Sequence, residues 1–205
     1  MRGAITDLNR LPVNLPGRVI MTDDSLRARM LVSHHLEYAA PVFEQGDFSI
    51  YSGSYKDVPL ALISTGFGVG EVFYYLCELI ELGIKEIIYI SACMSTTVAH
   101  GLGSVILAGG GSQSLLARAN AASAFYAIPV VTRTVLPADC KRPEEGCVID
   151  DFTGAFYSQS KVEGVEALSI LTVSENSKTG EKMEEHERRS RLHAASRLVF
   201  ETFAI

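Results

Sequence analysis

The fold is decided by residues 51–110, at whose centre lies the turn Ser64-Thr65-Gly66-Phe67-Gly68-Val69-Gly70. An apolar run at 58–63 precedes this turn, and a segment with helical periodicity, 71–82, follows it. Glycine leaves the backbone amides uncovered, so an anion or a ribose can approach them closely. The stretch therefore predicts a strand, a glycine turn and a helix, with a ligand site at the turn.

Strands and helices are predicted to alternate on both sides of this stretch. The predicted strands are 18–22, 48–55, 58–64, 86–92, 105–108, 130–136 and 167–173, and the predicted helices are 26–36, 71–82, 152–164 and 181–204. Residues 37–47 and the alanine-rich stretch 109–125 receive no assignment. The alternation predicts an α/β fold with a largely parallel sheet and helices on both of its faces.

Length and charge limit the classes of function. A chain of 205 residues with 47% hydrophobic residues fits one domain, predicted at 18–205 after an irregular N-terminal arm at 1–17. The net charge is -6, and the only basic stretch, 182–197, has acidic residues interleaved. These observations argue against a nucleic-acid partner.

Neither a membrane segment nor a disulfide framework is indicated. The N-terminus lacks the apolar core of a signal peptide, and no apolar run approaches the roughly 20 residues of a membrane span. The four cysteines, at 77, 93, 140 and 147, show no CxxC spacing. We expect a cytoplasmic protein with reduced thiols, no membrane partner and no metal. A metal or redox loop at Cys140 and Cys147 is the alternative.

Five motifs occur in an order that resembles a known family. They are DDSLRAR at 23–29, YSGSYK at 51–56, STGFG at 64–68, the strand 87–94, and LTVSEN at 171–176 followed by TGE at 179–181. This order is similar to the nucleoside phosphorylase family, which includes bacterial purine nucleoside phosphorylase and uridine phosphorylase. The resemblance implies a single-domain, three-layer α/β fold whose central mixed sheet is partly barrel-like and flanked by helices. Relative to the family, segments 111–129 and 136–147 are short.

The resemblance also implies a reaction and its partners. A purine or uridine nucleoside and phosphate would give the free base and (deoxy)ribose 1-phosphate, with phosphate as co-substrate and no other cofactor. Because the family builds its sites at dimer interfaces, the chain is expected to form a homo-oligomer, or a hetero-oligomer with an active paralogue.

On the phosphate side, the motifs imply a reduced set of contacts. Arg27 matches the family's phosphate-binding arginine, and Thr65 and Gly66 belong to the turn that borders the phosphate; a surface arginine is the alternative for Arg27. Asp23 stands where the family has a small residue, and its carboxylate would repel phosphate. The two further arginines of the family fall near Gly46 and at Tyr89, and the small hydroxyl residue falls at Ala92. The sequence therefore predicts a degenerate phosphate site.

On the nucleoside side, the resemblance assigns the ribose and base contacts and two catalytic residues. The predicted nucleoside-binding residues are Phe67, Gly68, Cys93, Met94, Ile149, Asp150, Asp151 and Phe152. The family's ribose-gripping glutamate falls at Phe152, which cannot accept hydrogen bonds from hydroxyl groups. Glu175 matches the acid that protonates the departing purine, and Arg188 matches the arginine that pairs with it. A surface salt bridge is the alternative for this pair, as core packing is for Phe67.

Three hypotheses follow from these residues. The first is a nucleoside phosphorylase with a degenerate phosphate and ribose site. The second is a catalytically inactive nucleoside-binding or regulatory paralogue, and the third is a nucleosidase that uses water instead of phosphate. Base release with and without phosphate distinguishes the first from the third, and nucleoside binding without turnover indicates the second.

Overall fold

The computed structural model describes residues 14–66, 68–141, 145–184, 187 and 193–205. The described strands are β1 (Arg18–Thr22), β2 (Glu37–Gln45), β3 (Phe48–Tyr55), β4 (Val58–Ser64), β5 (Glu86–Ser95), β6 (Val105–Ala108), β7 (Val130–Arg133), β8 (Val135–Leu136), β9 (Val148–Ile149) and β10 (Glu166–Asn176). The described helices are α1 (Ser25–His35), α2 (Val69–Glu81), α3 (Gln113–Phe125), α4 (Thr153–Val162) and α6 (His193–Ala204).

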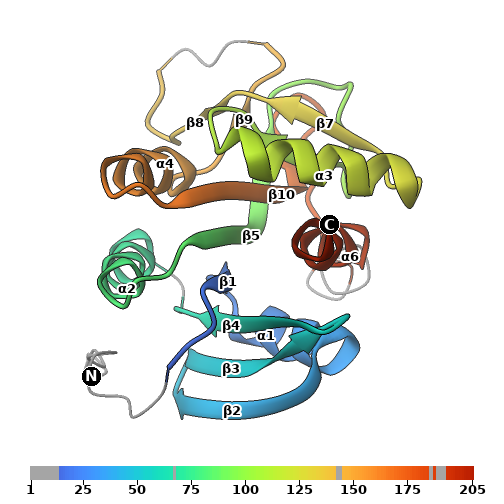
Figure 1. Ribbon diagram of the computed structural model, residues 1–205. Coiled ribbons are helices and arrows are strands. Elements are labelled where there is room, and N and C mark those ends of the chain that lie inside the picture. Colours follow the sequence, from blue (N-terminus) through green and yellow to red (C-terminus); the bar gives the residue numbers. More distant parts are fainter. Residues whose placement is uncertain (1–13, 67, 142–144, 185–186, 188–192) are drawn as a thin grey trace.

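A single mixed sheet organises the molecule, with the strand order β2-β3-β4-β1-β5-β10-β6-β7 (Figure 1). Strand β1 pairs in parallel with β4 and β5, and β5 pairs in parallel with β10. Strands β2, β3 and β4 form an antiparallel meander, and β6 runs antiparallel to β10. The mixed sheet flanked by helices agrees with the fold class that the resemblance implied, whereas the largely parallel sheet predicted from alternation alone was too simple.

Helices cover both faces of the sheet, as near-continuous apolar strands require. Helices α2 and α4 pack on one face, where Leu76, Leu79 and Phe156 join a core cluster with Ile87 and Leu171. Helices α1, α3 and α6 pack on the other face, in a second cluster. Figure 1 shows α2 and α4 on one side of β5 and β10, and α3 and α6 on the other.

Strand β5 continues beyond the end of its pairing with β1, and this extension shapes the site. Met94 and Ser95, its last two residues, pair with Ile149 and Val148 of β9. Strand β9 in turn pairs in parallel with β8. The short β8–β9 unit therefore holds the segment leading to α4 against the carboxyl end of β5.

Local sequence chemistry explains several element ends. Asp24 is the N-cap of α1, and its side chain accepts hydrogen bonds from the Leu26 and Arg27 amides. Lys56 and Asp57 join β3 to β4 with φ angles of 49° and 64°, as a two-residue hairpin turn with right-handed strand twist requires. Gly83 follows α2 with a φ of 80°, which suits glycine at a helix end.

Three elements were not predicted, and two predicted ones differ. One of the three is the short strand β9. The unassigned residues form edge strand β2, which is mostly exposed and interrupted by Pro41, and helix α3, which Ser112 caps. The predicted strand 130–136 is divided into β7 and β8. The predicted terminal helix 181–204 is described as helix α6 only from His193, while Lys182 forms a β-bridge with Glu175. The charge periodicity of the segment that starts at residue 181 is typical of a helix. At Lys182, however, the backbone pairs with β10 instead of forming helix. Most of the predicted arm 1–17 lies outside the described residues.

Candidate active site

A pocket of about 340 Å³ lies at the carboxyl ends of β5 and β10, beside the first turn of α2. Predicted site residues from separate parts of the chain line it: Gly68, Cys93, Met94, Ile149, Asp150, Asp151, Phe152 and Glu175. The lining also includes Asp23, Val69, Val72, Tyr89, Ala92 and Ser174. The carboxyl edge of an α/β sheet is a common place for ligand sites. The described residues predicted for the nucleoside side therefore share one pocket.

A bulge in β10 turns two consecutive residues toward the pocket. The register with β5 pairs Val173 with Cys93 and Glu175 with Met94, so Ser174 is an extra residue in the strand. In a regular strand, Ser174 and Glu175 would point to opposite faces of the sheet. Bulges re-aim side chains in this way and occur often beside active sites. The bulge allows both residues to line the pocket.

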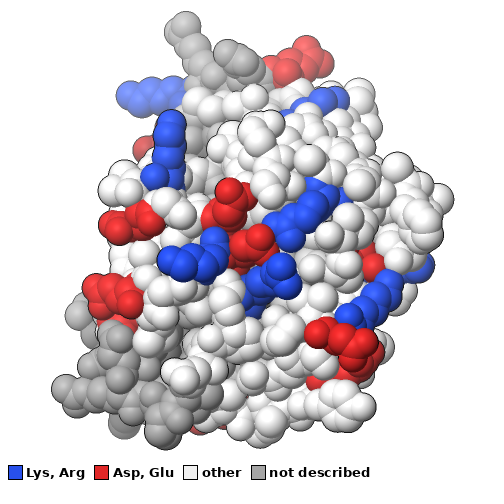
Figure 2. Space-filling model, in the orientation of Figure 1, with Lys and Arg blue, Asp and Glu red and all other residues white. Residues whose placement is uncertain are grey.

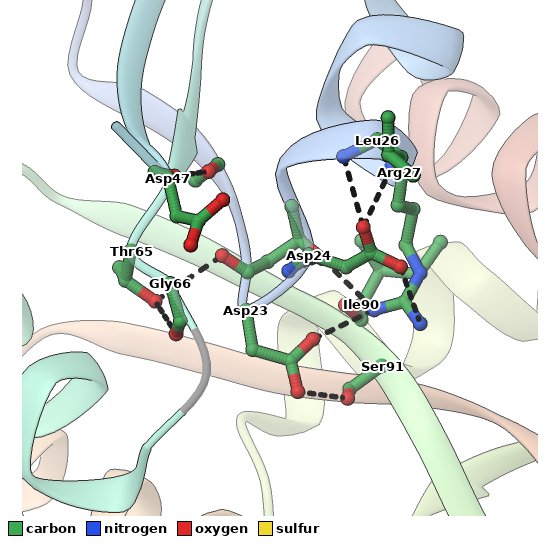
Figure 3. Close-up of polar contacts among 11 residues, drawn as sticks. Asp23, Asp24, Leu26, Arg27, Asp47, Thr65, Gly66, Ile90 and Ser91 are labelled. Carbon is green, nitrogen blue, oxygen red and sulfur yellow. Dashed lines mark hydrogen bonds and ion pairs between the residues drawn. The ribbon is translucent and has the colours of Figure 1, made fainter. Parts of the chain in front are cut away.

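The predicted phosphate-binding arginine points into the protein (Figure 3). The Arg27 side chain is only 7% exposed, and Nη1 donates hydrogen bonds to Thr22 Oγ1 at 2.9 Å and to the Ile90 carbonyl at 3.2 Å. The same nitrogen forms an ion pair with Asp23 Oδ1 at 2.7 Å. Arg27 does not belong to the described lining of the pocket. Its charge is therefore already compensated by the protein.

Asp23 lies between this arginine and the pocket. Its Oδ1 accepts from Arg27, and its Oδ2 accepts from the Ser91 hydroxyl at 2.9 Å, as Figure 3 shows. Asp23 also lines the pocket. The Asp23 carboxylate therefore faces the pocket next to the guanidinium that was expected to hold phosphate. A phosphate bound there would be repelled strongly by this carboxylate, because both are negatively charged.

Thr65 and Gly66, the other predicted phosphate contacts, support the turn rather than line the pocket. The Thr65 amide donates to the Thr22 carbonyl at 2.9 Å, which joins the end of β4 to the end of β1. Thr65 is 3% exposed. Gly66 has a φ of 83°, a left-handed conformation that favours glycine. The predicted ribose contact Phe67 lies outside the described residues.

Asp150 contacts neutral donors at the start of α4. Its Oδ2 accepts from the Thr153 amide at 2.8 Å and from the Thr153 hydroxyl at 2.6 Å. Burial raises the pKa of the Asp150 carboxyl above its ordinary value, the Thr153 hydrogen bonds oppose this effect, and the nearby Asp23 carboxylate adds to it. A negative charge on Asp150 therefore costs more free energy in the pocket than in water.

Asp151 lies at the more exposed edge of the pocket. Its Oδ1 accepts from the Ala138 amide at 2.6 Å, which ties the β8 side of the site to the β9–α4 connection. The family's ribose-gripping glutamate was expected at Phe152, one position further along. The structure brings both Asp150 and Asp151 to the pocket, so carboxylates are present although that glutamate is absent.

The aromatic side chains of Phe152 and Tyr89 contact each other and line the pocket. Phe152 is 2% exposed; its ring meets Tyr89 edge-on at 4.7 Å and stacks on Phe156 at 5.5 Å. Burial raises the pKa of the Tyr89 hydroxyl well above its ordinary value, and the carboxylates of Asp23 and Asp150 add to this effect. The hydroxyl is therefore protonated at neutral pH. Phe152 packs in the core and also lines the site.

Glu175, the predicted acid, forms an ion pair with Lys182 Nζ at 2.9 Å. Lys182 is 70% exposed, so solvent screens this pair, and such pairs contribute about 0–1 kcal/mol. Asn176, the next residue, is buried and fixes the loop that follows, because its Nδ2 donates to the carbonyls of Thr97 and His100. The predicted partner Arg188 lies outside the described residues.

Two of the four cysteines, Cys93 and Cys147, are buried. All four are free, and burial, followed by the Asp150 carboxylate, raises the pKa of the Cys93 thiol. Cys93 therefore lines the pocket as a neutral thiol. Among the described residues, no group of three or more His, Cys, Asp or Glu side chains is placed to hold a metal ion.

The surface in Figure 2 carries Lys and Arg interleaved with Asp and Glu, without a broad basic area on the face shown. Such a surface lacks the electrostatic footprint of a nucleic-acid-binding protein on this face. Within the part of the chain that the structure describes, no helix has the length and apolar character needed to cross a bilayer.

Sequence reasoning did not select Ser91, Ser174 or the first turn of α2 as parts of the site. Ser91 lies two residues after Tyr89, on the same face of β5, so strand periodicity was the signal that could have identified it. Val72 lies four residues after Gly68, one helical turn into α2. For Ser174 the sequence carried no signal, because a bulge depends on how β10 pairs with β5.

Comparison with known proteins gives a consistent result. The chain is 25% identical over 231 aligned positions to a purine nucleoside phosphorylase DeoD-type 2 of Vibrio parahaemolyticus, with 97% of this chain and 98% of the relative covered. It is 28% identical to the DeoD-type enzyme of Tolumonas auensis, over 84% of this chain and 86% of the relative. It is 26% identical to that of Bacillus subtilis, over 85% of this chain and 88% of the relative. No protein-family model matches the chain. Similarity along most of the chain therefore supports the resemblance to the nucleoside phosphorylase family.

Proposed function

We propose that this chain binds a purine nucleoside in the pocket and acts as a slow nucleoside phosphorylase. The products would be the free base and (deoxy)ribose 1-phosphate. One observation carries the proposal: separate segments of the chain bring those predicted nucleoside-side residues that the structure describes to one pocket, next to Glu175. The purine preference comes from the names of the similar proteins.

The chain's own residues suit cleavage of a glycosidic bond. Charge develops on the sugar as the base departs, so carboxylates beside the sugar stabilise the transition state more than the bound nucleoside. Asp150 and Asp151 supply such carboxylates. Glu175 is paired with Lys182 as a carboxylate, so it acts as the acid only after it has taken up a proton; a well-placed acid then raises the rate of base release about 100-fold or more.

The phosphate side explains why the reaction would be slow. Arg27, the remaining phosphate-binding arginine, is paired with Asp23, and Asp23 itself faces the pocket. An incoming phosphate dianion would have to separate that pair or lie against its carboxylate. Each lost hydrogen bond to a charged group costs about 1.5–3 kcal/mol. Phosphate would therefore bind weakly.

The Asp23 carboxylate favours hydrolysis as a second candidate function. Each of its oxygens accepts one hydrogen bond from the protein, and a carboxylate oxygen has a further lone pair that a water molecule can use. Water in this position would give free ribose instead of ribose 1-phosphate. The inactive nucleoside-binding paralogue is the remaining alternative.

Product analysis separates these functions. Inosine, guanosine and adenosine are incubated with the purified chain, with and without phosphate, and the free base and sugar product are quantified by chromatography. The proposal predicts base release that increases with phosphate and yields ribose 1-phosphate. Equal release without phosphate supports hydrolysis, whereas binding without release supports the paralogue. Absence of both binding and release contradicts the proposal.

The predicted association with a second copy or an active paralogue also belongs to this proposal, since it follows from the resemblance alone. Light scattering after size-exclusion chromatography measures the mass of the assembly. A mass of at least twice the 22.2 kDa of one chain is expected. A monomer at assay concentration contradicts that prediction.

A further inference from the structure

The side chain of Asn176 joins the end of β10 to the loop that follows β5. Asn176 is 2% exposed and is not part of the described lining of the pocket. Its Nδ2 donates hydrogen bonds to the Thr97 carbonyl at 2.9 Å and to the His100 carbonyl at 3.1 Å. An amide nitrogen carries two protons, so both of its donor positions are used. The loop after β5 is therefore fixed to the residue that follows Glu175.

The same residue closes the turn that follows β10. Its Oδ1 accepts from the Lys178 amide at 2.9 Å and from the Thr179 amide at 3.2 Å. Its backbone amide donates to the Glu181 carbonyl at 2.9 Å, and its backbone carbonyl accepts from the Gly180 amide at 2.9 Å. Buried polar groups whose bonds are all made hold their surroundings rigidly. Asn176 therefore determines the shape of this turn.

The turn returns the chain beside Glu175. Glu175 and Lys182 form an antiparallel β-bridge, and their side chains pair at 2.9 Å. The Met183 amide donates to the Ser174 carbonyl at 2.8 Å, which extends the pairing across the bulge in β10. The place of the Glu175 carboxylate at the pocket therefore depends on the turn that Asn176 closes.

We propose that Asn176 is a positioning residue for base release and that it acts through Glu175. Its hydrogen bonds hold the backbone on both sides of the turn, so the carboxyl of Glu175 keeps one place beside the departing base. A shift of about 1 Å in a reacting group can lower a rate about 100-fold, so a small movement of this turn affects the reaction. The inference rests on the proposed function, because it concerns the acid of that reaction.

The first test is the kinetics of Asn176→Ala, which removes the side-chain hydrogen bonds. Initial rates of base release over a range of inosine concentrations, at saturating phosphate, give kcat and KM. We expect kcat to fall about tenfold or more, because the acid is displaced. The KM for inosine should change less than about twofold, because Asn176 does not belong to the described lining of the pocket.

A double-mutant cycle with Glu175→Gln distinguishes positioning from general damage. If Asn176 acts through the carboxyl of Glu175, its removal has little left to disturb once that carboxyl is absent. Asn176→Ala should therefore lower kcat by less than about twofold in the Glu175→Gln background. A fall of the same size in both backgrounds contradicts the inference, because Asn176 would then act independently of Glu175.

Gly180→Ala strains the same turn from its exposed side and applies if Asn176→Ala does not fold. Gly180 has a φ of 75°, and a methyl group there meets no atom of the described residues within 4 Å, so the strain is confined to the backbone. The matched control is Gly83→Ala at the end of α2, where φ is 80° and a methyl group likewise has space. Both variants should lose similar thermal stability, but only Gly180→Ala should lower kcat, by a few-fold.

The outcomes separate this inference from the proposed function. If the wild type releases base and Asn176→Ala keeps its kcat, the inference is wrong and the proposed function stands. A raised KM with unchanged kcat has the same meaning, since it assigns Asn176 to nucleoside binding. If Asn176→Ala is unfolded and Gly180→Ala matches Gly83→Ala in kcat, the inference is also wrong. If the wild type releases no base, both the inference and the proposed function are wrong.

Discussion

The regions proposed to bind phosphate and the nucleoside differ in how far the protein itself occupies them. On the phosphate side, Arg27 is buried and its guanidinium contacts Asp23, Thr22 and the Ile90 carbonyl. On the nucleoside side, Glu175 and the segment 149–152 line a pocket of about 340 Å³. On the phosphate side, the charge of Arg27 is compensated within the protein, whereas on the nucleoside side carboxylates face the pocket.

The difference teaches that the same residue can stabilise the fold and weaken the expected activity. Asp23 and Arg27 are an i, i+4 pair at the start of α1, next to the Asp24 cap. Removing one partner of a buried pair commonly costs about 3–5 kcal/mol, because the other charge is left uncompensated. Under the proposed function, a contact that anchors α1 would therefore also keep Arg27 from a phosphate.

The largest expected effect comes from placing the family's glutamate back on the nucleoside side. Phe152→Glu introduces a carboxylate into a 2% exposed position between Tyr89 and Phe156. We expect the free energy of unfolding to fall by about 3–5 kcal/mol, because the new charge has no partner. Urea unfolding measures the change.

Phe152→Leu is the matched control for this substitution. It keeps the position apolar and should cost only about 1–2 kcal/mol. A Phe152→Glu variant that is as stable as the wild type would show that the aromatic packing around position 152 can rearrange to admit a carboxylate. It would also show that the ribose side retains more of the family's geometry than we infer.

The next largest effect concerns the acid beside the base. Glu175→Gln keeps the size of the side chain but removes the proton that would be donated, so base release should fall about 100-fold. Initial rates of base release from inosine measure it. Glu181→Gln is the control, since Glu181 is exposed and does not line the pocket. Unchanged release in the Glu175→Gln variant would mean that Glu175 acts only as the partner of Lys182.

A smaller effect is expected on the phosphate side. Asp23→Asn removes the carboxylate that faces the pocket while keeping its shape, so the affinity for phosphate should increase about tenfold. The phosphate dependence of base release gives this value. The thermal stability should fall at the same time, because Arg27 loses its ion pair.

Asp57→Asn, with the same change of charge at a distant turn, should alter neither property. If Asp23→Asn lowers stability without improving the use of phosphate, then Asp23 serves only as an anchor of Arg27. In that case the weakness of the phosphate side has another cause.

The smallest effect is expected at the exposed end of the nucleoside side. Lys182→Gln removes the partner of Glu175, and an exposed pair contributes about 0–1 kcal/mol. Base release should therefore change by a few-fold at most, and the difference should vanish at high salt. A loss as large as that of Glu175→Gln would show that Lys182 is part of the catalytic arrangement.

Much of the fold could be predicted where the sequence signal is local. The hairpin of β3 and β4 has the predicted bounds, because two apolar runs flank a two-residue turn. Strand β2 was missed because an exposed edge strand has no buried face to create an apolar pattern. The early start of the terminal helix was wrong, because the chain turns back after Asn176 and Lys182 pairs with Glu175 of β10, which the charge periodicity of this region does not reveal.

The candidate site could likewise be predicted only in part. Motif order indicated the residues of the nucleoside side, and the structure places those that it describes around one pocket. The orientation of Arg27 could not be predicted, because it depends on acceptors in β1 and β5 that are distant in sequence from one another. The repulsive role of Asp23 was predicted, whereas its ion pair with Arg27 emerged only from the structure.

The most direct test of the difference between the two sides is the dependence of base release on phosphate in the wild-type chain. Inosine should saturate the protein, while the rate should still be rising at phosphate concentrations above about 1 mM, the upper end of common KM values. Saturation by micromolar phosphate would contradict the account, because it would show that Arg27 is available to the substrate despite its pairing with Asp23.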